Sequence, residues 1–245
     1  MLPSGNENLL ATYLRLGKSP DAVCRTITSG PAVQLDAGSA NGRVFLLMIG
    51  CGFDAYVVHR VHAGREGHLS TRNYFGPILE SFATYDYPQL RIHWPQHDAG
   101  PTARRSARIP SSPANACWLF GFNLPCYGGR LPLAPRASAT DGQLDFCAFR
   151  HGSLGTSRRY AAAVLLGQHR HLADCTMRRL DHLRVTSEAR VPYQLAGAPG
   201  GFLPVDIRVL RRRLTVVIPP EYAQRFSKRG QSPPADYPGE TTSMK

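Results

Sequence analysis

The stretch RVFLLMIGCGFDA (Arg43–Ala55) carries the pattern that decides the fold. Its apolar run over Arg43–Gly50 predicts a strand, and the turn former Gly52 then opens a helix at Phe53. The turn-like residues 38–42 join this strand to an earlier one. Short strand patterns interrupted by few helices continue after it, which favours a sandwich or barrel-like β domain.

Working outward from this stretch gives the other elements. Further strands are predicted at Val33–Asp36, Leu90–Trp94, Ala116–Phe122, Leu144–Phe149, His182–Thr186, Val191–Leu195, Val205–Leu210 and Leu214–Ile218. Further helical patterns cover Gly5–Leu16, Tyr74–Tyr85 and Tyr160–Gln168. The polar stretch 96–113 is interpreted as a long hairpin loop, because strand patterns of similar character lie on both sides of it.

Composition limits the class of protein. The 245 residues are 42% hydrophobic, which is enough for a sizeable core, and their formal net charge is +12. This charge suits anionic partners. No apolar run reaches the roughly 18–20 residues of a membrane-spanning helix, and no signal-peptide pattern opens the chain. We therefore expect a cytoplasmic protein whose membrane contact, if any, is peripheral. The six cysteines form no C-x-x-C pair and are interpreted as reduced core residues.

The segment before the first helical pattern allows two interpretations. Ser4 and Glu7 have capping-box spacing, so a helix is expected to begin near Gly5. A glycine turn that leads into a helix N-terminus can bind an anion through backbone N–H groups and the helix dipole. The alternative is a capped surface turn without a ligand.

Four motifs in order carry a family resemblance. PSGNENLLA (Pro3–Ala11) resembles the P-x-G-T-x-N-[DE]-[FL]-A segment of the diacylglycerol kinase-like lipid kinases, the group that includes sphingosine kinases and bacterial lipid kinases. Gly52-Phe53-Asp54-Ala55, Pro135-x-Ala137 and Asp141-Gly142-x-Leu144-Asp145 follow in the family's order. The ordered set spans roughly residues 1–220 and is far more specific than any one motif.

The resemblance implies a fold and a domain organisation. Family members have an N-terminal α/β nucleotide-binding domain and a C-terminal β-sandwich, with ATP and the lipid head group between them. The expected class is thus mainly β with α (α+β). Residues 1–30 would be a remnant of the nucleotide-binding domain, residues 31–225 an antiparallel β-sandwich, and 226–245 a disordered tail. The family's earlier G-G-D-G-T loop does not occur in the sequence, which we expect to begin after it.

The resemblance also implies nucleotide-binding residues. Gly5, Asn6 and Asn8 fall on positions that contact ATP in the family. Asn6 stands where threonine is usual, and its longer amide changes the geometry of that contact.

A magnesium site and a lipid-side residue are implied as well. Ser138, Asp141 and Gln143 fall on a loop that holds a structural Mg²⁺ through the aspartate and two main-chain carbonyls. The alternative is a tight turn at Asp141-Gly142. Asp54 resembles a cleft-facing residue near the lipid head group, and its alternative role is that of an acid in the first turn of a helix.

The family's catalytic acids have no counterpart in the aligned segment. The D-G-E motif falls on Gln194–Pro199, where Ala196 and Ala198 occupy both acidic positions. An alanine cannot take a proton from the acceptor hydroxyl, and loss of a general base typically costs about 10²–10⁴ in rate. We therefore expect a lipid kinase family protein, using ATP and Mg²⁺, whose transfer step is impaired or absent.

Two alternatives remain. One is a non-catalytic sandwich that binds a lipid or a protein, and the expected partner is a lipid substrate or an anionic membrane surface. Self-association stays open. The other, a nucleic-acid-binding module, rests on charge alone and ranks lowest, because Arg104-Arg105, Arg178-Arg179 and Arg211–Arg213 are dispersed and lack interleaved aromatic residues.

Overall fold

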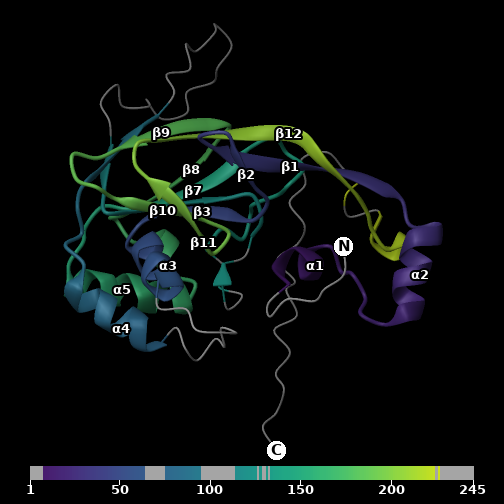
Figure 1. Cartoon of the computed structure of the whole chain (residues 1–245), viewed down its shortest axis with the longest axis horizontal. Coiled ribbons are helices and arrows are strands. Elements are labelled where there is room, and N and C mark those ends of the chain that lie inside the picture. The colour runs from purple at the N-terminus through teal and green to yellow at the C-terminus, as the bar shows by residue number, and fades with distance from the viewer. Residues whose placement is uncertain are drawn as a thin grey trace, which may run out of the picture.

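The computed structural model describes residues 8–63, 75–94, 114–125, 127–128, 131, 133–223 and 226, with the side chains of 75–79 left aside. Figure 1 shows two stacked antiparallel sheets, with helices below the second sheet and another helix at the far end of the long strands. This arrangement confirms the expected α+β class with an antiparallel β-sandwich.

In the described part of the chain each sheet has six strands, and the strand pairings there are all antiparallel. The first sheet has the order β2 (Arg43–Phe45), β1 (Ala32–Ala40), β12 (Val205–Val217), β9 (His182–Thr186), β4 (Leu90–His93), β5 (Ala114–Ala116). The second has the order β11 (Ala198–Phe202), β10 (Pro192–Leu195), β3 (Met48–Gly52), β6 (Trp118–Phe122), β7 (Leu144–Phe149), β8 (Cys175–Leu180).

Helices cover the outer face of the second sheet. They are α3 (Phe53–Ala63), α4 (Phe75–Thr84) and α5 (Leu154–Leu165), and the short 3-10 turns η3 (His169–His171) and η4 (Pro220–Tyr222) follow later in the chain. Because this sheet is covered on both faces, β3, β6 and β7 are buried at every position. In β4 of the first sheet, by contrast, buried and exposed residues alternate, as expected for a sheet with one solvated face.

Two apolar clusters follow from these layers. Leu90, Leu119, Leu183 and Ile207 belong to the cluster that both sheets share, and all four are at most 1% exposed. The other cluster lies between the second sheet and the helices and is rich in aromatic rings. In this second cluster the ring of Phe53 stacks on the ring of Trp118, and their centroids are 4.7 Å apart.

The first helix is shorter than predicted. It spans only α1 (Leu9–Tyr13), because Asn8 at its N-cap has φ 48° and Arg15, just after it, has φ 56°, both outside the helical region. The predicted start near Gly5 lies outside the described residues. The docking of this helix is as expected: Tyr13 and Leu14 pack with residues of the sandwich, including Leu35 and Ile218.

Several strand boundaries also differ from the prediction. The apolar run Arg43–Gly50 is divided between β2 and β3, which belong to different sheets. Ala116–Phe122 is divided likewise, at Cys117. Conversely, the two strands predicted within 205–218 are one strand, β12, whose pairing with β1 shifts register between Leu35 and Ala37. The chain changes sheets within apolar runs that contain no turn former, which is why composition gave no boundary there.

One α-helix, two strands and two 3-10 turns were not predicted: α2 (Pro20–Ser29), β8, β11, η3 and η4. The α2 helix begins in standard fashion, with the Ser19 hydroxyl accepting from the Ala22 N–H at 3.3 Å and Pro20 in the first turn. It lies at the far end of β1 and β12 (Figure 1). Among the described residues, no helix is both long and apolar enough to cross a membrane.

Candidate functional site

A buried carboxylate marks the start of α3. Asp54 is the second residue after β3, in the first turn of the helix, and is only 7% exposed. The Tyr127 hydroxyl donates to its Oδ1, and the Gln194 amide donates to its Oδ2 at 2.8 Å. Burial raises the pKa of Asp54, and these two hydrogen bonds act in the opposite direction by favouring the charged form.

Gln194 connects this carboxylate to a hairpin. The residue lies on β10 opposite Gly50 of β3 and is 1% exposed. Its Oε1 accepts from the Gly197 N–H at 2.7 Å, while its Nε2 also lies 2.8 Å from Met48 Sδ. A Cβ at Gly50 would clash with the Asp54 carboxylate, so the pair of side chains needs a glycine at that position.

The hairpin itself carries Ala196 and Ala198, the two alanines that the resemblance predicts at acidic positions of the family. Leu195 pairs with Ala198, which leaves Ala196 and Gly197 as a two-residue loop with φ 50° and 85°. Positive φ at both central residues is the signature of a type I′ turn. Ala196, Gly197 and Ala198 are all exposed, and His62 Nε2 lies 3.0 Å from the Gly197 carbonyl oxygen.

A second group of acids surrounds the loop before β7. Asp141 Oδ1 accepts from the Gln143 N–H at 3.0 Å, which closes a tight turn through Gly142 at φ 73°. The buried Asp36 of β1 accepts from the Gly142 N–H and from the Arg212 N–H, both at 2.7 Å. Asp36 thereby ties this loop to the register shift between β1 and β12.

Arg179 of β8 is the cation of this acidic group. Its Nη2 donates to Asp141 Oδ2, and its Nε lies 3.6 Å from Asp145 Oδ2. Burial raises the pKa of Asp141 and raises that of Asp145 to about 6, and Arg179 opposes both shifts. For both acids, burial thus disfavours the charged form more than the Arg179 charge favours it.

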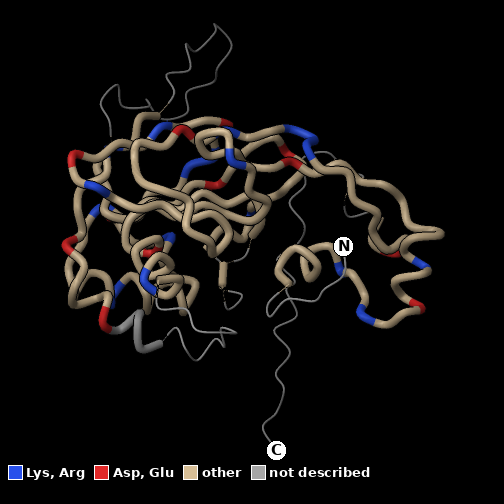
Figure 2. Tube along the Cα trace, viewed as in Figure 1, with Lys and Arg blue, Asp and Glu red and all other residues tan. Residues whose placement is uncertain are grey.

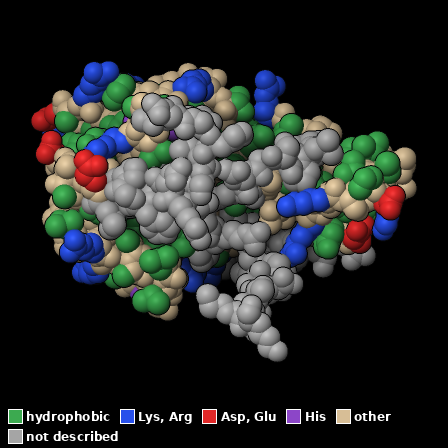
Figure 3. Space-filling model, turned by 60° about the horizontal axis from the view of Figure 1, so that its bottom comes forward, with side chains coloured by type: hydrophobic (Ala, Val, Ile, Leu, Met, Phe, Trp, Pro, Cys, Tyr) green, Lys and Arg blue, Asp and Glu red, His purple; other side chains and the backbone are tan. Residues whose placement is uncertain are grey.

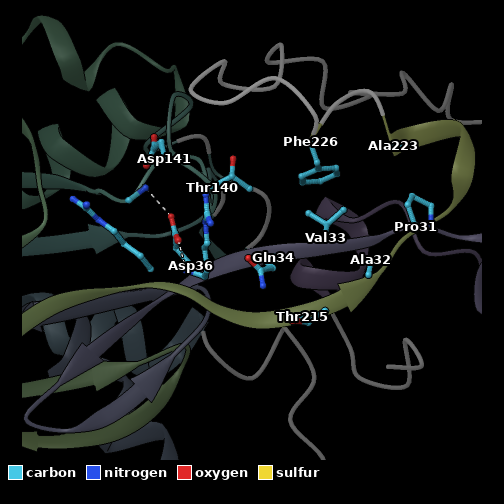
Figure 4. Close-up of a pocket in the computed structure, with 13 residues that line it drawn as sticks. Pro31, Ala32, Val33, Gln34, Asp36, Thr140, Asp141, Thr215, Ala223 and Phe226 are labelled. Carbon is cyan, nitrogen blue, oxygen red and sulfur yellow. Dashed lines mark hydrogen bonds between the residues drawn. The ribbon is translucent and has the colours of Figure 1, made fainter.

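A cavity of about 1030 Å³ opens between the acidic loop and the ends of β1 and β12. Figure 4 shows Asp36 and Asp141 at one end of it, and Val33, Phe226 and Pro31 at the other. Arg211 and Arg212 also line it. Sequence analysis identified no cavity here.

The predicted nucleotide residues are only partly described. Gly5 and Asn6 lie outside the described residues. Asn8 precedes α1, and its carbonyl oxygen accepts from the Thr12 N–H at 2.8 Å. With five residues, α1 is too short for the dipole-based anion site that the predicted helix suggested. The nucleotide contacts of Gly5, Asn6 and Asn8 stay predictions.

The predicted magnesium ligands lie on one loop, and the Asp141 carboxylate among them already has two hydrogen-bond partners. Ser138 is 3% exposed, with its hydroxyl 3.1 Å from that of Thr140. Asp141 uses one oxygen for the Gln143 N–H and the other for Arg179. In the described part of the chain, no group of three or more His, Cys, Asp and Glu side chains is arranged to hold a metal. The Arg179 guanidinium on Asp141 opposes a second positive charge on the same carboxylate, and the magnesium ligands Ser138, Asp141 and Gln143 stay predictions.

Sequence reasoning missed four residues of these two groups. Gln194 and Tyr127 engage Asp54, while Asp36 and Arg179 engage the Asp141 loop. Gln194 lies at the edge of the segment aligned with D-G-E. Its amide side chain was the sequence signal for a role in this group. The other contacts depend on chain segments far apart in sequence.

Comparisons with known proteins agree on the fold. Residues 48–218 match the family model of the YegS C-terminal NAD kinase beta sandwich-like domain. A protein of Bacillus subtilis (strain 168) named diacylglycerol kinase is 25% identical over 228 residues, which are 92% of this chain and 71% of that protein.

Solved structures show the same fold at lower identity. The crystal structure of a diacylglycerol kinase from Bacillus anthracis str. Sterne superposes with a TM-score of 0.60 at 18% identity, covering 90% of this chain and 68% of that one. A further chain from the same organism gives a TM-score of 0.59 at 17% identity, covering 87% and 66%. The chain thus spans between 66% and 71% of the length of these relatives.

Proposed function

Because the chain belongs to the family with a YegS C-terminal NAD kinase beta sandwich-like domain, we propose that it is a lipid kinase family protein whose transfer step is impaired or absent in these 245 residues. The family reaction would be ATP-dependent phosphorylation of a lipid hydroxyl, with Mg²⁺ accompanying the nucleotide. The names of the Bacillus relatives support the lipid class. The shared sandwich supports a common architecture.

The exposed hairpin is the observation that carries this proposal. Phosphoryl transfer depends on positioning of the phosphates and on a group that takes the proton of the acceptor hydroxyl. The hairpin presents its tip to solvent, yet Ala196 and Ala198 offer only methyl groups there. A base is therefore missing from the place where the resemblance puts it.

Asp54 is the buried carboxyl beside this hairpin, and it is a poor substitute for the missing base. A general base must come within about 2.6–3.2 Å of the proton it removes. Both oxygens of Asp54 already accept hydrogen bonds, and the side chain is almost completely buried. We infer that Asp54 holds Gln194 and the hairpin in place, on the side of the site where the lipid head group would lie.

A non-catalytic lipid-binding role is the second candidate, and the charge of the chain favours it. Figure 2 shows lysines and arginines spread along the trace rather than gathered on one element. On the described part of the face in Figure 3, basic side chains are interspersed with apolar ones. Such a surface suits an anionic membrane better than the continuous basic groove of a nucleic-acid-binding protein.

A transfer assay tests the catalytic part of the proposal. The purified chain is incubated with γ-labelled Mg-ATP and mixed micelles of diacylglycerol, beside the Bacillus subtilis relative as a positive control. We expect no labelled lipid above the no-protein control. The paired variant Ala196→Asp/Ala198→Glu should also stay inactive, since the phosphate-binding G-G-D-G-T loop is not in the sequence used. Labelled lipid from the unmodified chain would overturn the proposal.

Vesicle sedimentation tests the membrane part. The chain should bind vesicles that contain anionic lipid and release them as salt increases, because screening limits electrostatic reach to about 8 Å at physiological ionic strength. Neutral vesicles serve as the control. Equal binding to both compositions at every salt concentration would contradict an electrostatic membrane contact.

A further inference from the structure

We propose that Arg179 is a built-in cation that replaces a divalent metal at the Asp141 loop, so that the loop is independent of metal, and that removing this arginine creates a divalent-cation site on Asp141 and Asp145. The proposal concerns the internal ion balance of the sandwich and is independent of the transfer reaction.

Strand register places the arginine. In the β7–β8 pair, Arg179 lies directly opposite Asp145, so the guanidinium and this carboxylate are cross-strand neighbours. The Arg179 side chain then reaches Asp141 Oδ2 in the preceding loop. One guanidinium therefore lies between two carboxylates that are four residues apart in sequence.

The acids need a positive charge at this place. The side chains of Asp141 and Asp145 are 8% and 6% exposed, and Asp36 is 3% exposed beside the same loop. The cations near them are Arg179 and Arg136, which both act electrostatically on Asp145. Three buried carboxylates in one loop region would repel one another strongly without these cations.

Arg211 approaches the same loop from β12. Its Nε would lie 2.8 Å from a Cβ at Gly142, so its side chain covers the turn. Its Nη2 also lies 3.7 Å from Asp181 Oδ2, a separate and exposed acid. Arg211 therefore adds positive potential without neutralising Asp141 by direct contact.

The guanidinium and a divalent cation cannot share Asp141. Arg179 donates to one oxygen, the Gln143 N–H occupies the other, and a positive ion at coordination distance would meet the guanidinium charge at close range. Mg²⁺ also requires near-octahedral oxygen ligands and gives up its water reluctantly. Arg179 thus opposes the metal by its charge.

Removing the guanidinium would leave a set of hard oxygen ligands. Asp145 Oδ2 is completely buried, and among the described residues no group donates a hydrogen bond to it. Asp141 Oδ2 would lose its partner at the same time. Main-chain carbonyls of the 138–143 loop add oxygen ligands that do not depend on side-chain identity. A divalent cation could then neutralise both carboxylates without their protonation.

The test compares thermal unfolding of the full chain and of Arg179→Gln, without nucleotide, in Mg²⁺ and in KCl of equal ionic strength. The melting temperature of the wild-type chain should not respond specifically to Mg²⁺. Arg179→Gln should melt lower, and Mg²⁺ at tenfold its dissociation constant should raise its melting temperature by roughly 3–6 °C. If the variant is unfolded in KCl, circular dichroism should show refolding on addition of Mg²⁺.

Matched variants identify the site. Arg91→Gln removes an arginine from the exposed ion pair with Glu188 and should gain no response to Mg²⁺. The double variant Arg179→Gln/Asp141→Asn should lose the response that Arg179→Gln gained. A Mg²⁺-dependent melting temperature in the wild-type chain, or an Arg179→Gln variant that Mg²⁺ neither stabilises nor refolds, overturns the proposal.

Discussion

Replacing Gln194 by methionine tests the bridge between Asp54 and the hairpin. Methionine has nearly the shape of glutamine but provides no amide hydrogen for the buried carboxylate. The variant therefore removes the 2.8 Å bond to Asp54 Oδ2 and the 2.7 Å bond from the Gly197 N–H. The first joins a charged group and contributes about 1.5–3 kcal/mol, and the second, at an exposed turn, about 0.5–1.5 kcal/mol.

The expected loss of unfolding free energy is thus about 2–4 kcal/mol, or a fall in melting temperature of roughly 5–15 °C for a chain of this size. The loss should depend on pH with a definite sign. Because the Gln194 donor favours charged Asp54, its removal raises the folded-state pKa of Asp54 further. An acid with a raised folded pKa loses stability as pH rises from its unfolded pKa to its folded pKa, and the full loss persists above that range. The cost of Gln194→Met should therefore be larger at pH 8 than at pH 5.

Urea denaturation at both pH values provides the measurement, and Gln34→Met provides the control at an exposed strand position. The control should change the unfolding free energy by less than about 0.5 kcal/mol. In an Asp54→Asn background, the cost of Gln194→Met should shrink because the charge is gone. A Gln194→Met variant as stable as the wild type, or a cost unchanged by Asp54→Asn, would refute the proposed bridge.

Three further changes have defined outcomes. Asp145→Asn should flatten the pH dependence of stability: with a folded pKa of about 6 against an ordinary 3.8, the wild type should lose about 3 kcal/mol as pH rises through this window, as urea denaturation over pH 4–8 would show. Gly50→Ala should cost about 1–3 kcal/mol, because the new Cβ meets the Asp54 carboxylate; a melting temperature equal to that of the wild type would contradict the packing. Ala196→Asn should stabilise by about 0.5–1 kcal/mol in thermal melts, because asparagine tolerates positive φ better than alanine, whereas Ala198→Asn in β11 should give no such gain.

The sequence was sufficient to predict a helix or strand where a local pattern marks it. The helix after Gly52 and the strand Leu144–Phe149 were predicted, because a turn former or a continuous apolar run marks each of them. Edge strand β8 was missed because most of its residues, CTMRRL, are partly exposed and do not alternate. The division of Arg43–Gly50 between two sheets left no trace either, since Leu46 and Leu47 are as apolar as the strands they join.

The candidate site was predictable only in part, for a related reason. Asp54 and Asp141 stood out through ordered motifs, but their partners are set by register. Gln194 lies opposite Gly50, which is 144 positions earlier. Arg179 lies opposite Asp145 on β8, a strand that was not predicted. The resemblance therefore located the acids, while the neutralisation of their charge could be learned only from the pairing of strands.

The Ala196-Gly197 hairpin has alanine at a turn position where this residue costs stability. A type I′ turn needs positive φ at its first central residue, where aspartate, asparagine or glycine is favoured and a residue such as alanine costs about 1–2 kcal/mol. An acid followed by glycine would thus suit this turn geometrically as well as chemically. Turn stability therefore gives no reason for alanine at position 196. It follows that stabilisation by both Ala196→Asn and Ala196→Asp would show that the turn itself favours a residue other than alanine at this position.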